Sequence, residues 1–298
     1  MTRPVTASDI ATLEPLLINP AQYTAEHRTL LKQLVVRDPL KEGMGRVKHA
    51  PTYGTVNAHA ATEGDDVDNP QIYTISDVTF TPSEIVAQVI LTDKAVRTSG
   101  ENQVRAVGRL LGDAMARKTD TDGIAQFDSF TTHALGDGTA NIAIAKVTGA
   151  VTLLKGNATG GPAPSPLYMV IRPEQMAKLL DALAPTAGTY PIPEGVSEEA
   201  INEYLAHDFK LFGLRGGFWS GNITRTSTGT VGDANTLAKG ALFSKEALRY
   251  VPADEMSMEK ERLVRARSWL FQSSSDYAFG IFKQGWGCEL NYLAADPT

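Results

Sequence analysis

The sequence predicts an α+β fold in which one long helix is accompanied by long strands that come mainly late in the chain. Apolar residues recur at three- and four-residue spacing between positions 98 and 127, which is typical of an amphipathic helix. Residues 262–272 and 278–292 have the composition and alternation of strands. A Gly/Pro-rich linker at 156–166 separates the helix from a further strand, turn and helix at 167–183.

Composition favours a globular protein that folds in a reducing compartment. The chain has 298 residues, of which 42% are hydrophobic and 21% charged, enough for one large domain or two moderate ones. No apolar run approaches the ~18 residues of a membrane span, and no secretory signal is evident. The single cysteine, Cys288, excludes an intrachain disulfide and is expected to be a small buried residue.

Charge is distributed unevenly along the chain. The net charge of -6 argues against a protein whose whole surface binds nucleic acid. Residues 1–48 carry seven basic side chains, whereas residues 49–93 contain no Lys or Arg. The acidic residues of that second segment are Glu63, Asp65, Asp66, Asp68, Asp77, Glu84 and Asp93. The two segments either pair, within one chain or between neighbouring chains, or form two solvated surfaces that do not meet.

The first hundred residues predict an arm, a hairpin and a strand. Short helical pieces occupy the first forty positions, and residues 41–77 are punctuated by Gly and Pro. A compact domain rarely holds so long an irregular stretch without a special role, and a projecting hairpin is one such role. Residues 78–91 are rich in β-branched side chains and predict a strand that is interrupted near Pro82.

The long helix is predicted to begin at Thr98, which forms a capping box with Glu101. Three lines of residues run along it. The apolar line is Val104, Val107, Leu111 and Ala114, widened by Leu110 and Met115. A charged line at spacing four is Glu101, Arg105, Arg109, Asp113 and Arg117, which favours i,i+4 pairs. A line of small residues, Gly108, Gly112 and Ala116, is expected to let another backbone approach closely.

One string near the end of this helix, Asp120-Thr121-Asp122-Gly123, is similar to the nucleophile motif of haloacid dehalogenase-type phosphatases. That chemistry needs a parallel strand directly before the string, so that both carboxylates project beside a metal ion. A helical stripe precedes it here, so we interpret the string as the solvated, non-catalytic end of the helix. Because negative charge is unfavourable near a helix C-terminus, a basic partner such as Arg117 or Lys118 is expected nearby.

Searches for other chemistry find nothing, so no catalytic, cofactor-binding or metal-binding residue is predicted. There is no phosphate loop, nucleophile elbow or H-E-x-x-H string, and the five histidines have no metal-ligand spacing. This favours a structural role over an enzyme.

The C-terminal strands provide the last predictions from the residues themselves. Arg265 and Arg267 are expected to share a strand face with the apolar side chains at 263, 269 and 271. In 278–292 the even positions are nearly all apolar or small, which predicts one half-buried strand.

The order of these elements resembles that of the tailed-phage major capsid proteins, which share the Hong Kong 97-type fold. The resemblance rests on ARKTDTDGIAQF, RPEQMAKLL, GALFSKEAL and DYAFGIFKQGWGCEL. It implies an N-terminal arm at 1–48, an E-loop at 49–84, and a P-domain at 85–160 with a spine helix at about 98–127. It further implies an A-domain at 161–250, P-domain return strands at 251–281, and a closing strand back to the A-domain at 282–298.

The implied function is that of a major capsid protein, which self-assembles into hexamers and pentamers of an icosahedral phage head around double-stranded DNA. Its implied partners are itself, packaged DNA through non-specific contacts, and scaffolding, portal and cement proteins, without a membrane. It is implied to belong to the virion capsid and to assemble in the host cytoplasm, with no enzyme activity or cofactor. Two alternatives stay open: an encapsulin-like nanocompartment shell, and a metal-dependent phosphatase using Asp120 and Asp122.

Complementary charge supplies the candidate contacts between subunits. The candidates are Asp65, Asp66, Asp68, Arg105, Arg109, Arg117, Arg265 and Arg267. For the arginines, ordinary pairing within one subunit is the alternative. Some relatives of this fold crosslink subunits through a lysine and an asparagine, and the lack of lysine at 49–93 makes crosslinking through the E-loop unexpected.

Overall fold

A computed structural model describes residues 29–41, 45–54, 56, 58, 60, 72, 75–95, 101–157, 160–183, 214–226 and 236–295, without the side chains at 101–104 and 180–183. The described residues form two compact units. The first draws on residues 1–41, 82–126 and 250–279, and the second on 42–81, 127–249 and 280–298. The chain therefore alternates between the units, and neither unit is one continuous stretch of sequence.

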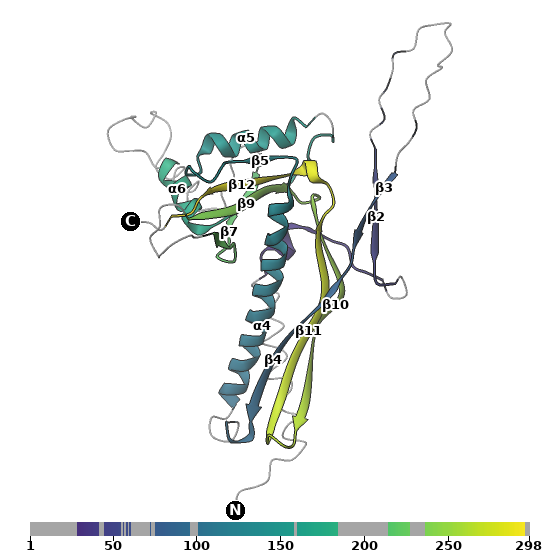
Figure 1. The fold of residues 1–298 in the computed structure, drawn as a ribbon, viewed down its shortest axis with the longest axis vertical. Helices are drawn as coiled ribbons and strands as arrows, with labels where there is room; N and C mark the ends of the chain where they lie inside the picture. Colours follow the sequence, from purple (N-terminus) through teal and green to yellow (C-terminus); the bar gives the residue numbers. More distant parts are fainter. Residues whose placement is uncertain are drawn as a thin grey trace, which may run out of the picture. The chain divides into compact units, whose positions relative to one another are not determined.

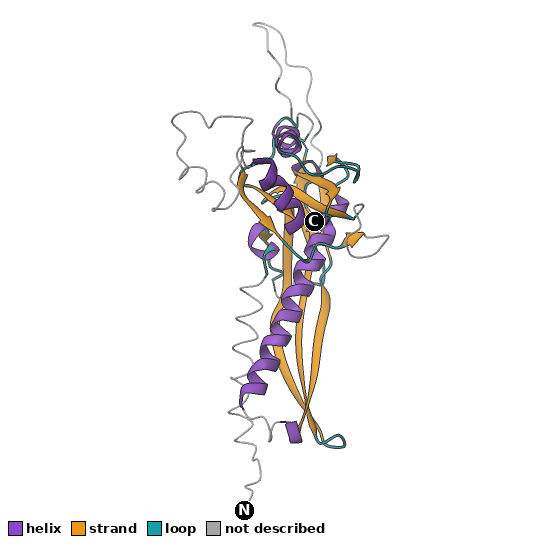
Figure 2. Ribbon diagram, turned by 90° about the vertical axis from the view of Figure 1, so that its left-hand side faces the viewer, coloured by secondary structure: helices purple, strands orange, loops and turns teal. Residues whose placement is uncertain are grey.

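The first unit is a helix packed on a sheet (Figures 1 and 2). The sheet has the strand order β1-β10-β11-β4. Its strands are β1 (Val36–Arg37), β4 (Ser83–Thr92), β10 (Leu248–Leu263) and β11 (Ser268–Ile281). The antiparallel register of β11 and β4 extends from Ser268 opposite Thr92 to Tyr277 opposite Ser83. The predicted interruption at Pro82 is confirmed, because β3 (Ile75–Phe80) ends just before it and β4 begins just after it.

The long helix of this unit is α4 (Glu101–Ile124), and it continues as the 3-10 helix η1 (Ala125–Ser129). Leu111 on α4 and Leu91 on β4 are buried together, with Val107 and Phe271 packed against them. Gly108, Gly112 and Ala116, the line of small residues, are all buried. The close approach of another backbone to this line stays a prediction. The apolar stripe is narrower than predicted, because Leu110 is 62% exposed.

The second unit is a sheet with the order β5-β12-β9-β6-β7, in which β8 also pairs with β9. Strands β6 and β7 are parallel, whereas β9 runs antiparallel to both β6 and β12. The strands are β5 (Ala134–Leu135), β6 (Leu167–Ile171), β7 (Leu214–Trp219), β8 (Arg225–Thr226), β9 (Leu237–Ser244) and β12 (Gly287–Leu293).

Two helices, α5 (Ile144–Lys155) and α6 (Pro173–Leu183), supply the apolar cover of this sheet (Figure 1). Leu154 and Leu179 from the helices are fully buried beside Met169 and Leu290 from the strands. Cys288 belongs to the same cluster and is buried, as predicted. Burial raises the pKa of its thiol to about 12.

A two-stranded ribbon also belongs to the second unit. Strands β2 (Lys48–Tyr53) and β3 pair antiparallel, with Lys48 opposite Phe80 and Tyr53 opposite Ile75. This pairing confirms the predicted hairpin at its described end. Most of residues 55–74, which connect the two strands, lie outside the described residues.

Two predictions about the late strands are wrong. Residues 264–267 form an exposed turn, not strand, in which the amide of Arg267 donates to the Val264 carbonyl at 3.3 Å and Arg267 has a φ of 45°. Arg265 and Arg267 therefore do not share a strand face. The single strand predicted at 278–292 is also interrupted, because the amides of Phe282 and Lys283 both turn to the Ala247 carbonyl and the 3-10 helix η2 (Gln284–Trp286) follows.

The predicted P-domain range of 85–160 spans both units. The middle segment of the first unit ends at Gln126, and residues 127–160 belong to the second unit. The reason is that α5 places Val147, Ala150 and Leu154 in the same apolar cluster as the strands of the second sheet.

Candidate functional site

The D-T-D-G string lies on the buried side of α4 and not in solvent. Asp120 is 2% exposed. Its Oδ2 atom accepts a hydrogen bond from the amide of Leu30 at 3.2 Å, and its Oδ1 atom accepts one from the amide of Leu31 at 3.1 Å. These amides stand at the start of the short helix α2 (Leu31–Leu34), where N–H groups have no partner within the helix. The prediction of a solvated helix end is therefore wrong, and Asp120 caps a second helix.

Gly123 and Asp122, next to Asp120, also make close contacts with other side chains of the first unit. A Cβ atom on Gly123 would lie 2.2 Å from Cδ2 of Leu31 and 3.2 Å from Cε1 of Phe279, so only glycine leaves room for these side chains. Asp122 accepts a hydrogen bond from Nζ of Lys118 at 2.6 Å, which confirms the predicted basic partner. The hydroxyl of Tyr277 donates to the other oxygen of Asp122 at 3.1 Å. Burial, followed by the charge of Asp122, raises the pKa of Tyr277.

This placement contradicts the geometry that a phosphatase needs. Both aspartates belong to the last turns of α4, and no parallel strand leads into them. Among the described residues, no three His, Cys, Asp or Glu side chains form a group able to hold a metal ion. Within the same residues, no helix is both long and apolar enough to cross a membrane.

The predicted contact residues fall into three places. Arg105, Arg109 and Arg117 are exposed on α4, as their spacing of four predicts. Arg265 and Arg267 are exposed in the turn between β10 and β11. The structure therefore places these arginines on two separate elements of the first unit. Asp65, Asp66 and Asp68 lie outside the described residues.

A third arginine near the β10–β11 turn was not predicted. The guanidinium of Arg262 makes two parallel bonds to Asp93, with Nη1 2.5 Å from Oδ1 and Nη2 2.7 Å from Oδ2. It also lies over the ring of Trp269, 4.9 Å from the centroid. The bonds to Asp93 raise the pKa of Arg262. Such a forked pair is geometrically specific, but no local pattern signals it because the partners are 169 residues apart.

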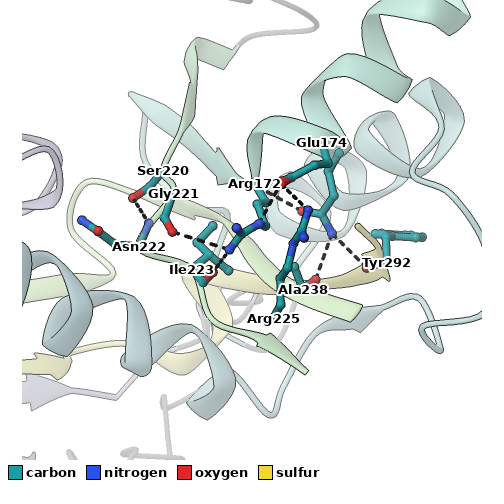
Figure 3. A network of polar contacts seen from close by, with 10 residues as sticks. Arg172, Glu174, Ser220, Gly221, Asn222, Ile223, Arg225, Ala238 and Tyr292 are labelled. Atoms are coloured by element: carbon teal, nitrogen blue, oxygen red, sulfur yellow. Dashed lines mark hydrogen bonds and ion pairs between the residues drawn. The ribbon is translucent and has the colours of Figure 1, made fainter. Parts of the chain in front are cut away.

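A polar network at the start of α6 was also missed (Figure 3). Nε of Arg172 donates to Glu174 at 2.8 Å, and Arg225 donates to the other carboxylate oxygen of Glu174. A second nitrogen of Arg172 donates to the backbone carbonyl of Ile223. Because these side chains are largely shielded from water, their ion pairs are screened less than surface pairs. The network ties the loop after β7 to α6.

Gln175 extends this network into the core. Its side chain is fully buried, accepts from the amide of Arg172 at 3.2 Å, and donates to the carbonyls of Ala238 at 2.9 Å and Tyr292 at 3.0 Å. The side-chain amide of Gln175 thus makes hydrogen bonds to backbone groups of β9, of β12 and of the residue before α6. The string RPEQ holds three of the residues of this network, and its sequence pattern predicted only the helix start at Pro173.

Exposed apolar side chains gather on the ribbon formed by β2 and β3. Tyr53 and Ile75 are opposite each other and are 57% and 60% exposed, and Ile72, beyond the strand, is 92% exposed. Single exposed apolar residues are ordinary. A two-stranded ribbon, however, is at best marginally stable alone in water, and an apolar surface on it is typical of an interaction site.

Comparison with known proteins finds structural relatives but no sequence relatives. No protein-family model matches the chain, and no curated protein sequence matches it. The capsid of Ralstonia phage GP4 matches with a TM-score of 0.66 and 13% identity, over 89% of this chain and 88% of that one. A structure from Mycobacterium phage Che8 matches with a TM-score of 0.63 and 16% identity, over 88% of this chain and 90% of that one.

A further match comes from outside the phages. A virus-like particle from Pyrococcus furiosus matches with a TM-score of 0.58 and 10% identity, over 92% of this chain and 97% of that chain. The matches thus extend over most of this chain and most of each compared chain. The chain has the Hong Kong 97-type fold of tailed-phage capsid proteins.

Proposed function

We propose that this chain is a major capsid protein that self-assembles into the hexamers and pentamers of an icosahedral phage head around double-stranded DNA. The observation that carries the proposal is the coverage of the match, because phage capsid structures align with 88–89% of this chain and with a similar share of their own. A fold shared over most of both chains favours a shared role for them.

Under this proposal the parts of the chain take the roles of the capsid fold. Residues 1–48 are the N-terminal arm, the ribbon of β2 and β3 is the base of an E-loop at 49–84, and α4 is the spine helix. The P-domain consists of α4 with β4, β10 and β11. The A-domain is the second sheet, and we extend it to include residues 127–160 because α5 packs in its core. The closing strand within 282–298 is β12.

Contacts between subunits follow from the exposed surfaces. The apolar side chains of Tyr53, Ile72 and Ile75 would be covered by a neighbouring subunit, which removes apolar area from water. The acidic residues Asp65, Asp66 and Asp68 would lie over a basic surface of the neighbour. Arg265 and Arg267 in the β10–β11 turn, or Arg105, Arg109 and Arg117 on α4, would supply that surface. Such complementary charge sets register and association rate more than affinity.

Electron microscopy of the purified chain, in negative stain, tests the proposal directly. We expect rings or closed shells, whose formation depends on protein concentration and on salt. A compact monomer at all concentrations and salt conditions would overturn the proposal. Arg265→Glu/Arg267→Glu and Arg105→Glu/Arg109→Glu then separate the two candidate basic surfaces, because only the surface that faces the acidic loop should lose assembly.

A second candidate is a nanocompartment shell that holds an enzyme cargo, since the fold is also shared with a virus-like particle from Pyrococcus furiosus over 92% of this chain. The contents of purified particles distinguish the two. Nuclease-protected double-stranded DNA supports the phage head, and a co-purifying enzyme supports the compartment. Neighbouring terminase and portal genes would favour the phage head, for which we propose virion location, assembly in the host cytoplasm, and scaffolding, portal and cement partners.

A further inference from the structure

Within the proposed arm, residues 29–40 form a strap that is held on the rest of the first unit in two different ways. Its first half contains α2, a helix of four residues. Isolated helices below ~12–15 residues are marginal in water, so α2 depends on what it contacts. Its second half is β1 and the residues after it, where the amides of Asp38 and Leu40 each donate at 2.9 Å to the carbonyls of Tyr250 and Pro252. The second half is therefore held by ordinary sheet pairing.

The first half is held by the D-T-D-G turn of α4. Leu30 has no side-chain cap to offer, and the two amides at the start of α2 are satisfied by the buried carboxylate of Asp120. Leu31 is 1% exposed, and its side chain fills the space that Gly123 leaves open. Lys32 adds a cation–π contact, with Nζ 5.3 Å from the centroid of the Tyr250 ring.

We propose that Asp120 and Gly123 are positioning residues, which form a docking site for residues 29–35 and thereby fix the place of this part of the N-terminal arm on the first unit. The inference rests on the proposed function for the meaning of the arm, and it adds a specific site to it. The carboxylate of Asp120 accepts hydrogen bonds from the two adjacent amides of Leu30 and Leu31, and the lack of a side chain at Gly123 leaves space for the side chain of Leu31. Because α2 is capped only while it contacts Asp120, we expect α2 to form only when it is docked on α4.

Hydrogen exchange on the full-length chain, dissociated to monomers, measures the docking directly. In Asp120→Ala, the amides of residues 30–34 should exchange about tenfold faster, the size of effect expected when an N-cap is lost. Asp120→Asn keeps one acceptor oxygen and should give a smaller increase. Residues 36–40 should stay protected in both variants, because their partners are the carbonyls of β10.

Two further variants separate docking from general damage to α4. Asp122→Asn removes a charge two residues away but no contact to α2, so exchange at residues 30–34 should stay at the wild-type rate. Gly123→Ala raises the helix propensity of α4 while its methyl group displaces Leu31. Exchange of residues 30–34 should therefore rise although α4 itself is not weakened, and the double variant with Leu31→Ala should show a coupling between the two positions.

The outcomes decide the inference in either direction. Unchanged exchange at residues 30–34 in both Asp120→Ala and Gly123→Ala overturns it, as does an equal rise in Asp122→Asn. If wild-type chain forms shells, Asp120→Ala should form fewer closed shells than Asp122→Asn, and an unchanged yield would overturn the positioning role. If wild-type chain forms no shells, the proposed function fails while the exchange measurements still test the docking site.

Discussion

Strands β6 and β4 show how differently the two units are stabilised. Every residue of β6, from Leu167 to Ile171, is buried, and the strand lies between β9 and β7 in its sheet. Along β4, which is an edge strand, alternate residues are exposed, including Val86 and Ile90. The second unit thus buries its central strand within itself, whereas the first unit leaves one side of its sheet to solvent or to a partner. Under the proposed function, assembly would cover the exposed side of the first unit.

The largest expected loss of stability comes from a cavity in the core of the second unit. Leu290 is fully buried in β12, and Leu290→Ala should lower the free energy of unfolding by about 2–5 kcal/mol, through lost apolar transfer and a residual cavity. Urea denaturation of the monomer measures this. Ile90→Ala on the exposed side of β4 is the control, for which a change within about 0.5 kcal/mol is expected. Equal losses at both positions would contradict the contrast.

A somewhat smaller effect is expected from Gln175. Replacement by leucine keeps the approximate volume but leaves the carbonyls of Ala238 and Tyr292 without this donor, and an unsatisfied buried group costs about 1–3 kcal/mol. The same denaturation experiment measures it, with Gln284→Leu on the exposed η2 helix as the matched control. A neutral result for Gln175→Leu would mean that water or a small shift replaces the lost bonds.

Cys288 is expected to make the stability of the second unit depend on pH. Its pKa is raised to about 12 by burial, above the usual value of about 8.5 that it regains on unfolding. Between these values the folded chain binds more protons than the unfolded chain, so stability falls as pH rises. The slope for one thiol is at most about 1.4 kcal/mol per pH unit. Denaturation at pH 8 to 10 should show a shallower fall in Cys288→Ala, and an unchanged slope would exclude the thiol as its source.

The smallest effect is expected at the ion pair between Arg262 and Asp93 in the first unit. The pair is forked but partly exposed, and exposed pairs contribute little to stability. Asp93→Asn should therefore lower the free energy of unfolding slightly, and added salt should reduce the difference from wild type. Glu259→Gln, at an exposed position of β10, removes the same charge and is the control. A loss as large as that of Leu290→Ala would show that the first unit depends on this pair far more than its exposure implies.

Local periodicity predicted the parts of the fold that are local in origin. Helix α4, the interruption at Pro82, the start of α6 at Pro173 and the burial of Cys288 all follow from residues close together in sequence. The turn at 264–267 was missed because Val264-Arg265-Ala266-Arg267 contains no Gly, Pro, Asn or Asp, the residues that usually mark a turn.

The candidate site was much less predictable, because its contacts join distant residues. The hydrogen bonds from the amides of Leu30 and Leu31 to Asp120 join residues about ninety positions apart. A D-x-D-G string does not by itself indicate that another helix will pack against it. The same holds for Gln175, whose acceptors are 63 and 117 residues away. Sequence spacing correctly placed Arg105, Arg109 and Arg117 on the exposed side of α4. It wrongly placed Arg265 and Arg267 on a strand, because the alternating sequence pattern of a strand does not change at a turn that lacks Gly, Pro, Asn and Asp.

The alternation of the chain between its two units has a consequence for synthesis on the ribosome. Gln88 on β4 bonds to Gln272 on β11, across 184 residues. The strand partner of β4 is therefore synthesised long after β4 itself, and pairing over such a distance is intrinsically slow. Until then, β4 and the apolar side of α4 are exposed in the nascent chain, which is when aggregation competes with folding. If the chain assembles as proposed, the first unit can offer its surfaces to another subunit only after β11 has been made.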